Sequence, residues 1–564
     1  MFTKKNWRIA FLFSLTSLFL LGVIFRLFKI QVLSHGSYQA QAEDQHGISY
    51  TLPAPRGEIY SRDEFSLVTN QPSYLLYGEP EKIAVSDVSV DWIAKEILAI
   101  LAARECPVIN AQEPSESYDS YQKLELCRDS LSARLSCDRQ WIPLIRNISV
   151  GKREKIENLG FPGLGFEVTP VRYYPEGKLA AHILGFVGFN EQGNPKGYYG
   201  LEGYYDGDLR GQDGLVLEER SALGEPILVG DFLKRPPQKG RDLVLTLDRA
   251  VQFVLAKSLK DGVKKYGAES GTVIVLNPTT GEIIALANYP DYDPSLSQQQ
   301  ESDEQQRKEE KEEKEEKKEE EKEAEQQEIE YPTQRRNLAV ASSYEPGSVI
   351  KALTMAAAIN EEKITPQTTF VSKPLEVGSN VIRTWDNQYY GESTMIEVLE
   401  RSDNTGAAWV ALEKLGKRTL REYFSRFGLG EKTDVDLEGD AAGILKPLSQ
   451  WYPIDLANAS FGQGLSATPL QVVSAFSVFA NDGVLMSPYL VREIRDNEKS
   501  ITFSPQKKRR VISKHAAKIM EGMLTKAAEH GEASFFVLED WKVAGKTGTA
   551  QIPVGGRYDP HKTN

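Results

Sequence analysis

The sequence predicts an α+β protein of several domains that follow one N-terminal apolar helix. Three observations support this prediction. The chain has 564 residues, which is more than one ordinary domain holds. Hydrophobic residues make up 40% and charged residues 26% of the chain, as in globular proteins. After one long uncharged stretch, strand-like and helix-like patterns both recur along the chain.

The N-terminus contains a segment with the composition of a membrane anchor. The 17 residues from Ile9 to Phe25 carry no charge, and this length is at the short end of the range for a transmembrane helix. The denser basic cluster precedes the run, and this favours a cytoplasmic N-terminus. A cleaved signal peptide is the alternative, but the cleavage-like Ala40-Gln41-Ala42 lies 15 residues past the run. We expect residues 1–29 to be a cytoplasmic stub and a single membrane anchor, with the rest outside the cytoplasm.

Charge and metal-ligand patterns exclude two classes of protein. The net charge is −13, and residues 301–330 alone hold 16 acidic and 7 basic residues. The chain therefore has no overall basic character, which argues against a nucleic-acid binder. Its six histidines and three cysteines show no metal-ligand spacing, so we expect neither a metal nor a cofactor. For Cys106, Cys127 and Cys137 the sequence allows two states: one disulfide with one free thiol, or three free thiols.

The sequence patterns indicate two large regions after the anchor. Residues 30–240 are mixed and irregular, and residues 241–564 begin with regular strand-like and helix-like patterns. Within the second region, residues 298–330 form a Glu/Lys/Gln tract that cannot bury a core, so we expect a solvated spacer; a partner-binding arm is the alternative. The patterns predict helices over 92–103, 249–266, 466–481 and 513–530, an antiparallel hairpin of 271–277 and 282–288, and strands over 74–77, 243–247, near 491 and over 541–547. From 331 to about 485 the pattern is mostly helical.

One short pattern combines a possible nucleophile with a possible base. Ser348 and Lys351 stand three residues apart at the start of an apolar helical stretch, so they share a helix face. A serine hydroxyl becomes a good nucleophile only when a base takes its proton, and a buried lysine can serve as that base. Taken alone, this pattern is equally typical of a capped helix start.

Two further patterns offer polar groups to a substrate. Ser402-Asp403-Asn404 lies between helical segments and offers a hydroxyl that could relay a proton and an amide that could hold a substrate. Lys546-Thr547-Gly548-Thr549 ends a strand-like run, and a lysine with two hydroxyls suits a carboxylate. Helix capping and a glycine turn are the respective structural alternatives.

In this order the three patterns match the serine penicillin-recognising signature of SxxK, S-D-N and K-T-G. The chain thus resembles the class B penicillin-binding proteins, which are monofunctional peptidoglycan D,D-transpeptidases. Further segments resemble the same family: Arg56-Gly57-Glu58-Ile59-Tyr60-Ser61-Arg62-Asp63, the stretch from Tyr174-Pro175 through His182-Ile183-Leu184-Gly185, Leu201-Glu202-Gly203-Tyr204-Tyr205-Asp206, Pro278-Thr279-Thr280-Gly281-Glu282-Ile283, Tyr344-Glu345-Pro346-Gly347-Ser348, and Gly462-Gln463-Gly464 with Thr468-Pro469.

The resemblance implies a fold and a role for each site residue. Residues 30–240 would be a pedestal of the dimerisation type, and residues 241–564 a transpeptidase domain with an antiparallel sheet, helices on both faces and an all-helical subdomain. Ser348 would be acylated and Lys351 would be its base, while Ser402 and Asn404 would relay a proton and hold a substrate amide. The carboxylate of a D-Ala-D-Ala stem peptide or a β-lactam would bind at a set of four residues: Lys546, Thr547, Gly548 and Thr549.

The implied activity is cross-linking of stem peptides through a serine acyl-enzyme during division or elongation, without a cofactor. The implied partners are peptidoglycan, β-lactams and a lipid-II glycosyltransferase in the membrane. The chain departs from the family pattern in the 298–330 insert and in ending 15 residues after Thr549, so we expect a C-terminally truncated transpeptidase domain. The alternatives are a non-catalytic scaffold of the division or elongation machinery and a D,D-carboxypeptidase.

Overall fold

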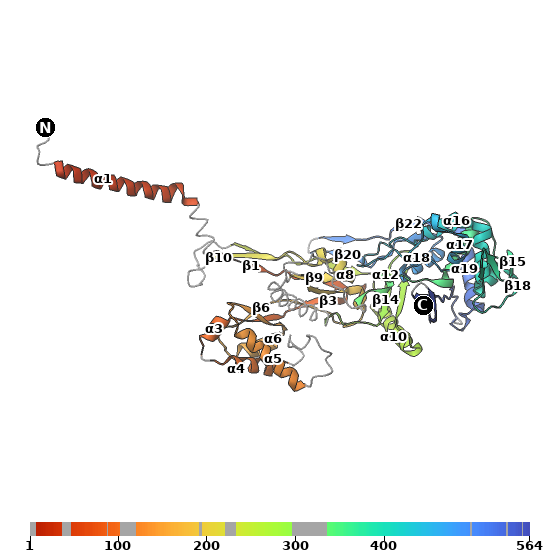
Figure 1. The fold of residues 1–564 in the computed structure, drawn as a ribbon, viewed down its shortest axis with the longest axis horizontal. Helices are drawn as coiled ribbons and strands as arrows, with labels where there is room; N and C mark the ends of the chain where they lie inside the picture. Colours follow the sequence, from red (N-terminus) through yellow and green to blue (C-terminus); the bar gives the residue numbers. More distant parts are fainter. Residues whose placement is uncertain are drawn as a thin grey trace. The chain divides into compact units, whose positions relative to one another are not determined.

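A computed structural model describes most of the chain in two compact units (Figure 1). Unit 1 comprises Met1–Pro55 and Gly211–Lys239, and unit 2 comprises Arg56–Arg210 and Gly240–Asn564. The predicted insert at 298–330 lies outside the described residues, and the predicted domain boundaries stay predictions. The described residues are 7–36, 47–86, 88–101, 120–190, 194–219, 233–295, 335–496, 499–536, 540–554 and 557–563.

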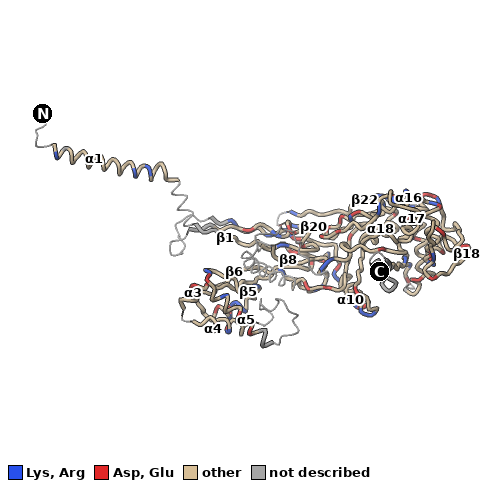
Figure 2. The backbone as a smooth tube through the Cα atoms, viewed as in Figure 1, with Lys and Arg blue, Asp and Glu red and all other residues tan. Residues whose placement is uncertain are grey.

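Unit 1 contains the predicted apolar helix. Helix α1 (Trp7–Phe28) continues into a short π-helix, η1 (Lys29–Leu33). The stretch Trp7–Leu33 has a mean hydropathy of 2.1 and is, within the described residues, the one helix long and apolar enough to cross a membrane. Figure 2 shows α1 without charge except for basic residues near its two ends, where long side chains can reach a lipid interface. The rest of unit 1 is an antiparallel sheet of β1 (Gly47–Leu52), β10 (Gly214–Glu219) and β11 (Leu233–Arg235).

Unit 2 contains a small module, within residues 74–168, in which helices pack on a three-stranded antiparallel sheet. The strand order is β5-β4-β6, and the buried side chains are mainly Leu and Ile. Cys127 lies in this core and is disulfide-bonded, whereas Cys137 is a free thiol; Cys106 lies outside the described residues. Of the two cysteine alternatives, the structure therefore has the one with a disulfide. The elements are β4 (Tyr74–Gly78), α3 (Pro80–Ala84), α4 (Val90–Ile100), α5 (Ser120–Leu135), β5 (Ile142–Ile148), α6 (Val150–Glu157) and β6 (Leu164–Val168).

A six-stranded sheet brings together segments that are hundreds of residues apart. Its order is β21-β20-β12-β2-β3-β7, with β12 parallel to β2 and the other pairs antiparallel. The predicted strand over 243–247 is β12, and its apolar side chains are fully buried. The strands are β2 (Ile59–Tyr60), β3 (Ser66–Gln71), β7 (Val171–Tyr173), β12 (Asp242–Leu245), β20 (Val491–Arg495) and β21 (Ser500–Thr502).

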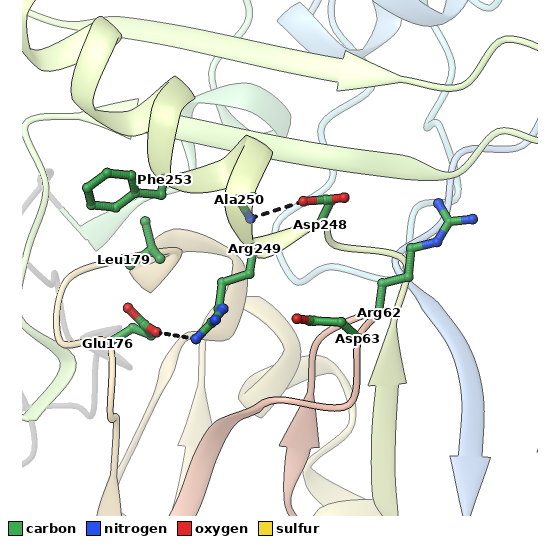
Figure 3. A pocket seen from close by; sticks show the side chains of 8 residues that line it. All are labelled: Arg62, Asp63, Glu176, Leu179, Asp248, Arg249, Ala250 and Phe253. Carbon is green, nitrogen blue, oxygen red and sulfur yellow. Dashed lines mark hydrogen bonds and ion pairs between the residues drawn. The ribbon is translucent and has the colours of Figure 1, made fainter.

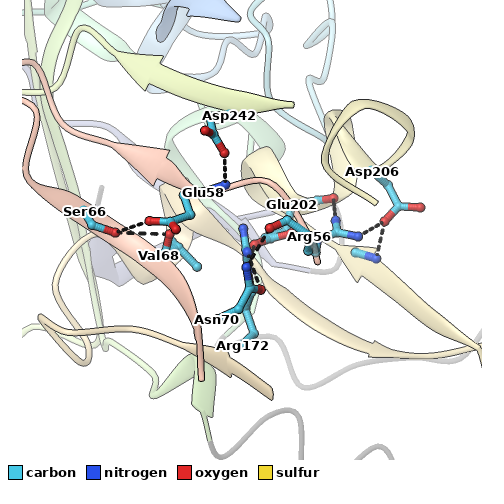
Figure 4. Close-up of polar contacts among 10 residues, drawn as sticks. Arg56, Glu58, Ser66, Val68, Asn70, Arg172, Glu202, Asp206 and Asp242 are labelled. Atoms are coloured by element: carbon cyan, nitrogen blue, oxygen red, sulfur yellow. Dashed lines mark hydrogen bonds and ion pairs between the residues drawn. The ribbon is translucent and has the colours of Figure 1, made fainter. Parts of the chain in front are cut away.

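Beside this sheet, a buried cluster of charged residues joins two of the segments that carry the family resemblance (Figure 4). Glu202 is completely buried, and its two carboxylate oxygens each lie 2.6 Å from an arginine Nε, that of Arg56 and that of Arg172. Arg56 Nη1 also lies 2.8 Å from Asp206, and Arg172 Nη1 donates to Asn70 at 3.0 Å. Both guanidinium groups are thus neutralised and hydrogen-bonded, which is the condition for keeping buried charges stable. The short elements around the cluster are α7 (Ala181–Leu184), β8 (Phe186–Phe189), β9 (Pro195–Tyr198), α8 (Gly200–Tyr204) and α9 (Asp206–Leu209).

The predicted hairpin and the helix before it are both present. β13 (Gly271–Leu276) pairs antiparallel with β14 (Ile283–Tyr289), and α10 (Arg249–Tyr266) packs against them. α10 begins where predicted because Asp248 caps it, accepting hydrogen bonds from two backbone N–H groups of the first turn. A pocket at this end of α10 is lined by paired charges, with Arg249 2.9 Å from Glu176 (Figure 3).

Helices α14, α15, α16 and α19 pack against α13 (Ile350–Asn360), whose residues are nearly all buried. In Figure 1, α16, α17 and α19 gather with β15 and β18 at one end of unit 2. The predicted helices over 466–481 and 513–530 are α18 and α19, but three short ribbons interrupt the region expected to be helical or lie just after it: β15/β18, β16/β17 and β19/β22. The elements are α12 (Leu338–Ala341), β15 (Thr369–Ser372), β16 (Leu375–Val377), β17 (Asn380–Ile382), β18 (Gly391–Thr394), α14 (Met395–Glu400), α15 (Asn404–Trp409), η5 (Val410–Leu415), α16 (Gly416–Arg426), η6 (Leu448–Gln450), α17 (Pro453–Ala459), α18 (Pro469–Ala480), β19 (Val484–Met486), β22 (Lys507–Arg510), α19 (Lys514–His530) and η7 (Ser534–Phe536).

The predicted strand over 541–547 is wrong. Residues 541–550 have irregular backbone, and a hairpin of β23 (Gln551–Val554) and β24 (Arg557–Thr563) follows them. Alternating side chains favour a strand, but a strand also needs a neighbouring backbone to complete its hydrogen bonds. Here Gly545 N–H instead donates to the carbonyl of Leu524 in α19, at 3.2 Å.

Candidate active site

The first two site residues lie at the start of α13. A single 3-10 turn, η4 (Gly347–Val349), leads into the helix, and the i, i+3 spacing places Lys351 beside Ser348 as predicted. Lys351 Nζ donates a hydrogen bond of 2.8 Å to Ser348 Oγ. Ser348 is partly exposed, while Lys351 is completely buried. A ligand can therefore reach the hydroxyl, and its amine neighbour is held away from water.

The turn between α14 and α15 brings Ser402 to the same amine. Lys351 Nζ donates to the backbone oxygen of Ser402 at 2.5 Å and to its Oγ at 3.1 Å. Ser402 has φ = +54°, a left-handed conformation that is strained for a residue with a side chain. Asp403 holds the turn in place because it caps α15, accepting from the backbone N–H groups of Thr405 and Gly406.

The third segment reaches the cluster through Lys546. Its Nζ donates to Ser402 Oγ at 3.0 Å, so the Ser402 hydroxyl accepts from two lysines. The same Nζ lies 3.3 Å from Thr547 Oγ1, and that hydroxyl donates to Glu532 at 2.8 Å. Residues from three distant parts of the chain thus form one continuous hydrogen-bonded path from Ser348 to Glu532.

Burial lowers the pKa of both lysines, and the charge of Lys546 lowers that of Lys351 further. Burial, together with the nearby charge of Lys546, holds the pKa of Lys351 well below its usual value, against the opposing effects of Asp403 and Glu532. Burial also lowers the pKa of Lys546 to about 8, while Glu532 acts in the opposite direction. Of the two amines, Lys351 is therefore the one better suited to accept a proton, and Lys546, with a pKa of about 8, is the one suited to carry a charge at neutral pH.

Two glycines let the separate segments approach each other. A Cβ on Gly548 would lie 2.9 Å from Val349 Cγ1 and 3.0 Å from the Pro346 carbonyl oxygen. Gly462 has φ = +86°, and a side chain there would collide with the backbone of Gly347. Gly548 thus allows the turn that precedes α13 to come close, a role beyond the ligand approach expected from the sequence.

The other predicted site residues lie around this path. Asn404 opens α15, and its side-chain amide donates to the Arg383 carbonyl oxygen at 3.1 Å. Thr549 is exposed, and its backbone oxygen lies next to Gly347. The strand-like run that this motif was expected to end is not a strand, since residues 541–550 have irregular backbone.

Sequence reasoning missed Glu532 and the supporting role of Asp403. Glu532 follows the end of α19 and belongs to none of the motifs, so nothing in the local pattern marks it. Helix capping is the structural alternative given for the whole motif, but it was not assigned to Asp403 in particular. Its capping position could have been inferred from its place directly before a helix.

Comparisons with known proteins agree with this arrangement. The family model described as "Penicillin-binding Protein dimerisation domain" matches residues 51–245, and that described as "Penicillin binding protein transpeptidase domain" matches residues 271–563. Stage V sporulation protein D of Bacillus subtilis is 31% identical over 540 residues, covering 94% of this chain and 74% of that protein. Peptidoglycan D,D-transpeptidase FtsI of Escherichia coli is 25% identical, covering 98% of this chain and 83% of that protein.

Solved structures show the same fold. Penicillin Binding Protein 2X from Streptococcus thermophilus superposes with a TM-score of 0.66 at 21% identity, covering 91% of this chain and 73% of that one. A peptidoglycan synthetase from Bifidobacterium adolescentis gives 0.64 at 24% identity, covering 92% and 88%. Because the transpeptidase model covers more than half of the chain and a dimerisation domain precedes it, this chain belongs to the class B penicillin-binding proteins.

Proposed function

We propose that this protein cross-links peptidoglycan as a D,D-transpeptidase that forms an acyl-enzyme on Ser348. The observation that carries the proposal is the completely buried amine of Lys351, 2.8 Å from a partly exposed serine hydroxyl. Burial lowers the pKa of this amine, so it loses its proton more readily and can then accept one from the hydroxyl that it faces. The names of the relatives, among them peptidoglycan D,D-transpeptidases, supply the substrate class.

In the acylation step, Ser348 Oγ attacks the carbonyl carbon of the penultimate D-Ala of a donor stem peptide. Its proton passes to Lys351 Nζ, and the developing oxyanion is held by the backbone N–H groups of Ser348 and Thr549. The peptide C–N bond then breaks, and the terminal D-Ala leaves with a proton delivered through the Ser402 hydroxyl. Ser402 suits this relay because it contacts both lysines.

In the transfer step, the amine of a neighbouring stem peptide attacks the ester carbonyl. The amine loses a proton to Lys351, a new amide bond forms, and Ser348 Oγ leaves with that proton restored. A D,D-carboxypeptidase would use water in place of the amine. In both reactions Asn404 would hold a substrate amide, and the carboxylate of the donor would bind at Lys546, Thr547, Gly548 and Thr549.

Labelling with a fluorescent penicillin tests the nucleophile. We expect the wild-type chain to form a covalent adduct on Ser348 that Ser348→Ala abolishes, as read by gel fluorescence and peptide mass. Ser343→Ala is the matched control, since Ser343 lies five residues earlier and is exposed. A folded wild-type chain that takes no label would instead support the non-catalytic scaffold. Incubation with a stem-peptide donor and an amine acceptor then separates transfer from hydrolysis.

The pH dependence of labelling follows from Lys546. Its ammonium binds the ligand carboxylate, so affinity is full below its pKa of about 8 and is lost as the pH rises through that value. We expect the second-order labelling rate to fall about tenfold per pH unit above this point. Lys546→Arg should remove this fall, because a guanidinium stays charged over the whole range. A rate that stays constant between pH 7 and 9.5 in the wild type would contradict the assignment.

We further propose that α1 anchors the protein in the cell membrane with its N-terminus in the cytoplasm. The apolar length of Trp7–Leu33 and the basic residues near its start support this orientation. The transpeptidase domain then works outside the cytoplasm. The dimerisation-type region would contact a lipid-II glycosyltransferase in the membrane, as the family resemblance implies.

A further inference from the structure

Glu532 contacts the hydroxyl to which the proposed mechanism assigns the carboxylate of the substrate. Its Oε2 accepts a 2.8 Å hydrogen bond from Thr547 Oγ1. Lys546 Nζ lies 3.3 Å from the same hydroxyl. Within the described residues, no carboxylate oxygen lies within 4 Å of Lys546 Nζ. In the proposed carboxylate subsite, a side chain of the protein itself therefore already binds the Thr547 hydroxyl, while the Lys546 ammonium has no carboxylate partner among the described residues.

We propose that Glu532 is an internal competitor for the carboxylate subsite, and that a substrate or β-lactam carboxylate must displace it from Thr547 before acylation. This inference rests on the proposed function and adds a residue that sets specificity. The hydroxyl has one proton to donate, so it cannot serve Glu532 and a ligand carboxylate at the same time. Two carboxylates beside one lysine would also repel each other.

The position of Glu532 makes such a displacement feasible. The residue is exposed, one position after Gly531, whose N–H is tied to the Ala527 carbonyl oxygen at 3.1 Å. The backbone is therefore fixed just before Glu532, while its side chain can turn into water at little cost. A hydrogen bond to an exposed carboxylate contributes modestly, so it can be replaced by a ligand that also pairs with Lys546.

The test compares a probe that carries the carboxylate with one that lacks it. A fluorescent penicillin and its methyl ester are reacted with the full chain in detergent at pH 6.5, below the pKa of about 8 of Lys546. Glu532→Gln removes the charge but keeps a similar shape. Glu529→Gln is the matched control, because Glu529 is also exposed and lies in the last turn of α19.

We expect Glu532→Gln to raise the second-order labelling rate about five- to tenfold for the penicillin, and to leave the rate for the ester unchanged. Glu529→Gln should change neither rate, and all variants should keep the wild-type melting temperature. An unchanged or lower rate with the penicillin, or an equal rise with both probes, would overturn the inference. Wild-type protein that takes no label from either probe would refute the proposed function as well, so the two failures are distinguishable.

Discussion

Lys351→Met should lower the second-order rate of penicillin acylation by about 10³- to 10⁴-fold and leave the protein folded. In the proposed mechanism Lys351 takes the proton from Ser348, and its amine is the buried neighbour of that hydroxyl at 2.8 Å. Methionine has a similar length and fits an apolar environment, so the helix core around α13 stays filled. The loss is then chemical rather than structural.

The measurement is the rate of fluorescent-penicillin labelling, taken together with the melting temperature. Lys363→Met is the matched control, since Lys363 is exposed and lies shortly after the same helix. It should label at the wild-type rate. A Lys351→Met protein that melts normally and still acylates within tenfold of wild type would show that another group acts as the base. Loss of folding would instead mean that the amine mainly supports the turn at Ser402.

The second large effect is expected at Glu202, far from the chemistry. Glu202→Gln should lower the free energy of unfolding by about 3–5 kcal/mol, because it leaves buried guanidinium groups without their shared carboxylate. Glu202 is completely buried and contacts Arg56 and Arg172 through both oxygens, each at 2.6 Å. Asp206 and Asn70 remain as partners for the two arginines but cannot replace the lost charge at Glu202.

Urea denaturation followed by tryptophan fluorescence measures this change. Glu157→Gln is the control, because Glu157 forms an exposed pair with Arg153 one helical turn away, and such pairs contribute about 0–1 kcal/mol. Equal denaturation midpoints for Glu202→Gln and wild type would contradict the expected role. Double substitution of Glu202 and Arg172 by apolar residues should recover part of the loss, since no unpaired charge is then left at that position.

Local patterns predicted the elements that depend on local interactions. The hairpin of β13 and β14 and the helices α10, α18 and α19 lie close to where the sequence placed them. Their capping residues and apolar periodicity act over a few positions, so the chain alone specifies them. The pairing of Ser348 with Lys351 belongs to this group, because a helix fixes neighbours three residues apart.

Long-range contacts explain why some of the secondary-structure predictions were wrong. Residues 541–547 were predicted as a strand, yet they have irregular backbone: Gly545 donates a hydrogen bond to α19, and the adjoining Gly548 lies against the turn before α13. The short ribbons between β15 and β22 were missed for a similar reason, since a strand is stabilised by its partner more than by its own sequence.

By itself, the sequence determined the family resemblance, the apolar N-terminal helix and the residue types available for catalysis. Only the tertiary structure decided that Lys351 is buried, that the Ser402 hydroxyl accepts hydrogen bonds from two lysines, and that Glu532 accepts one from the hydroxyl of Thr547. The physical reason is that burial and charge–charge interactions depend on which distant segments meet. Ser402 and Lys546 lie 144 positions apart, and no local pattern between them predicts their 3.0 Å contact.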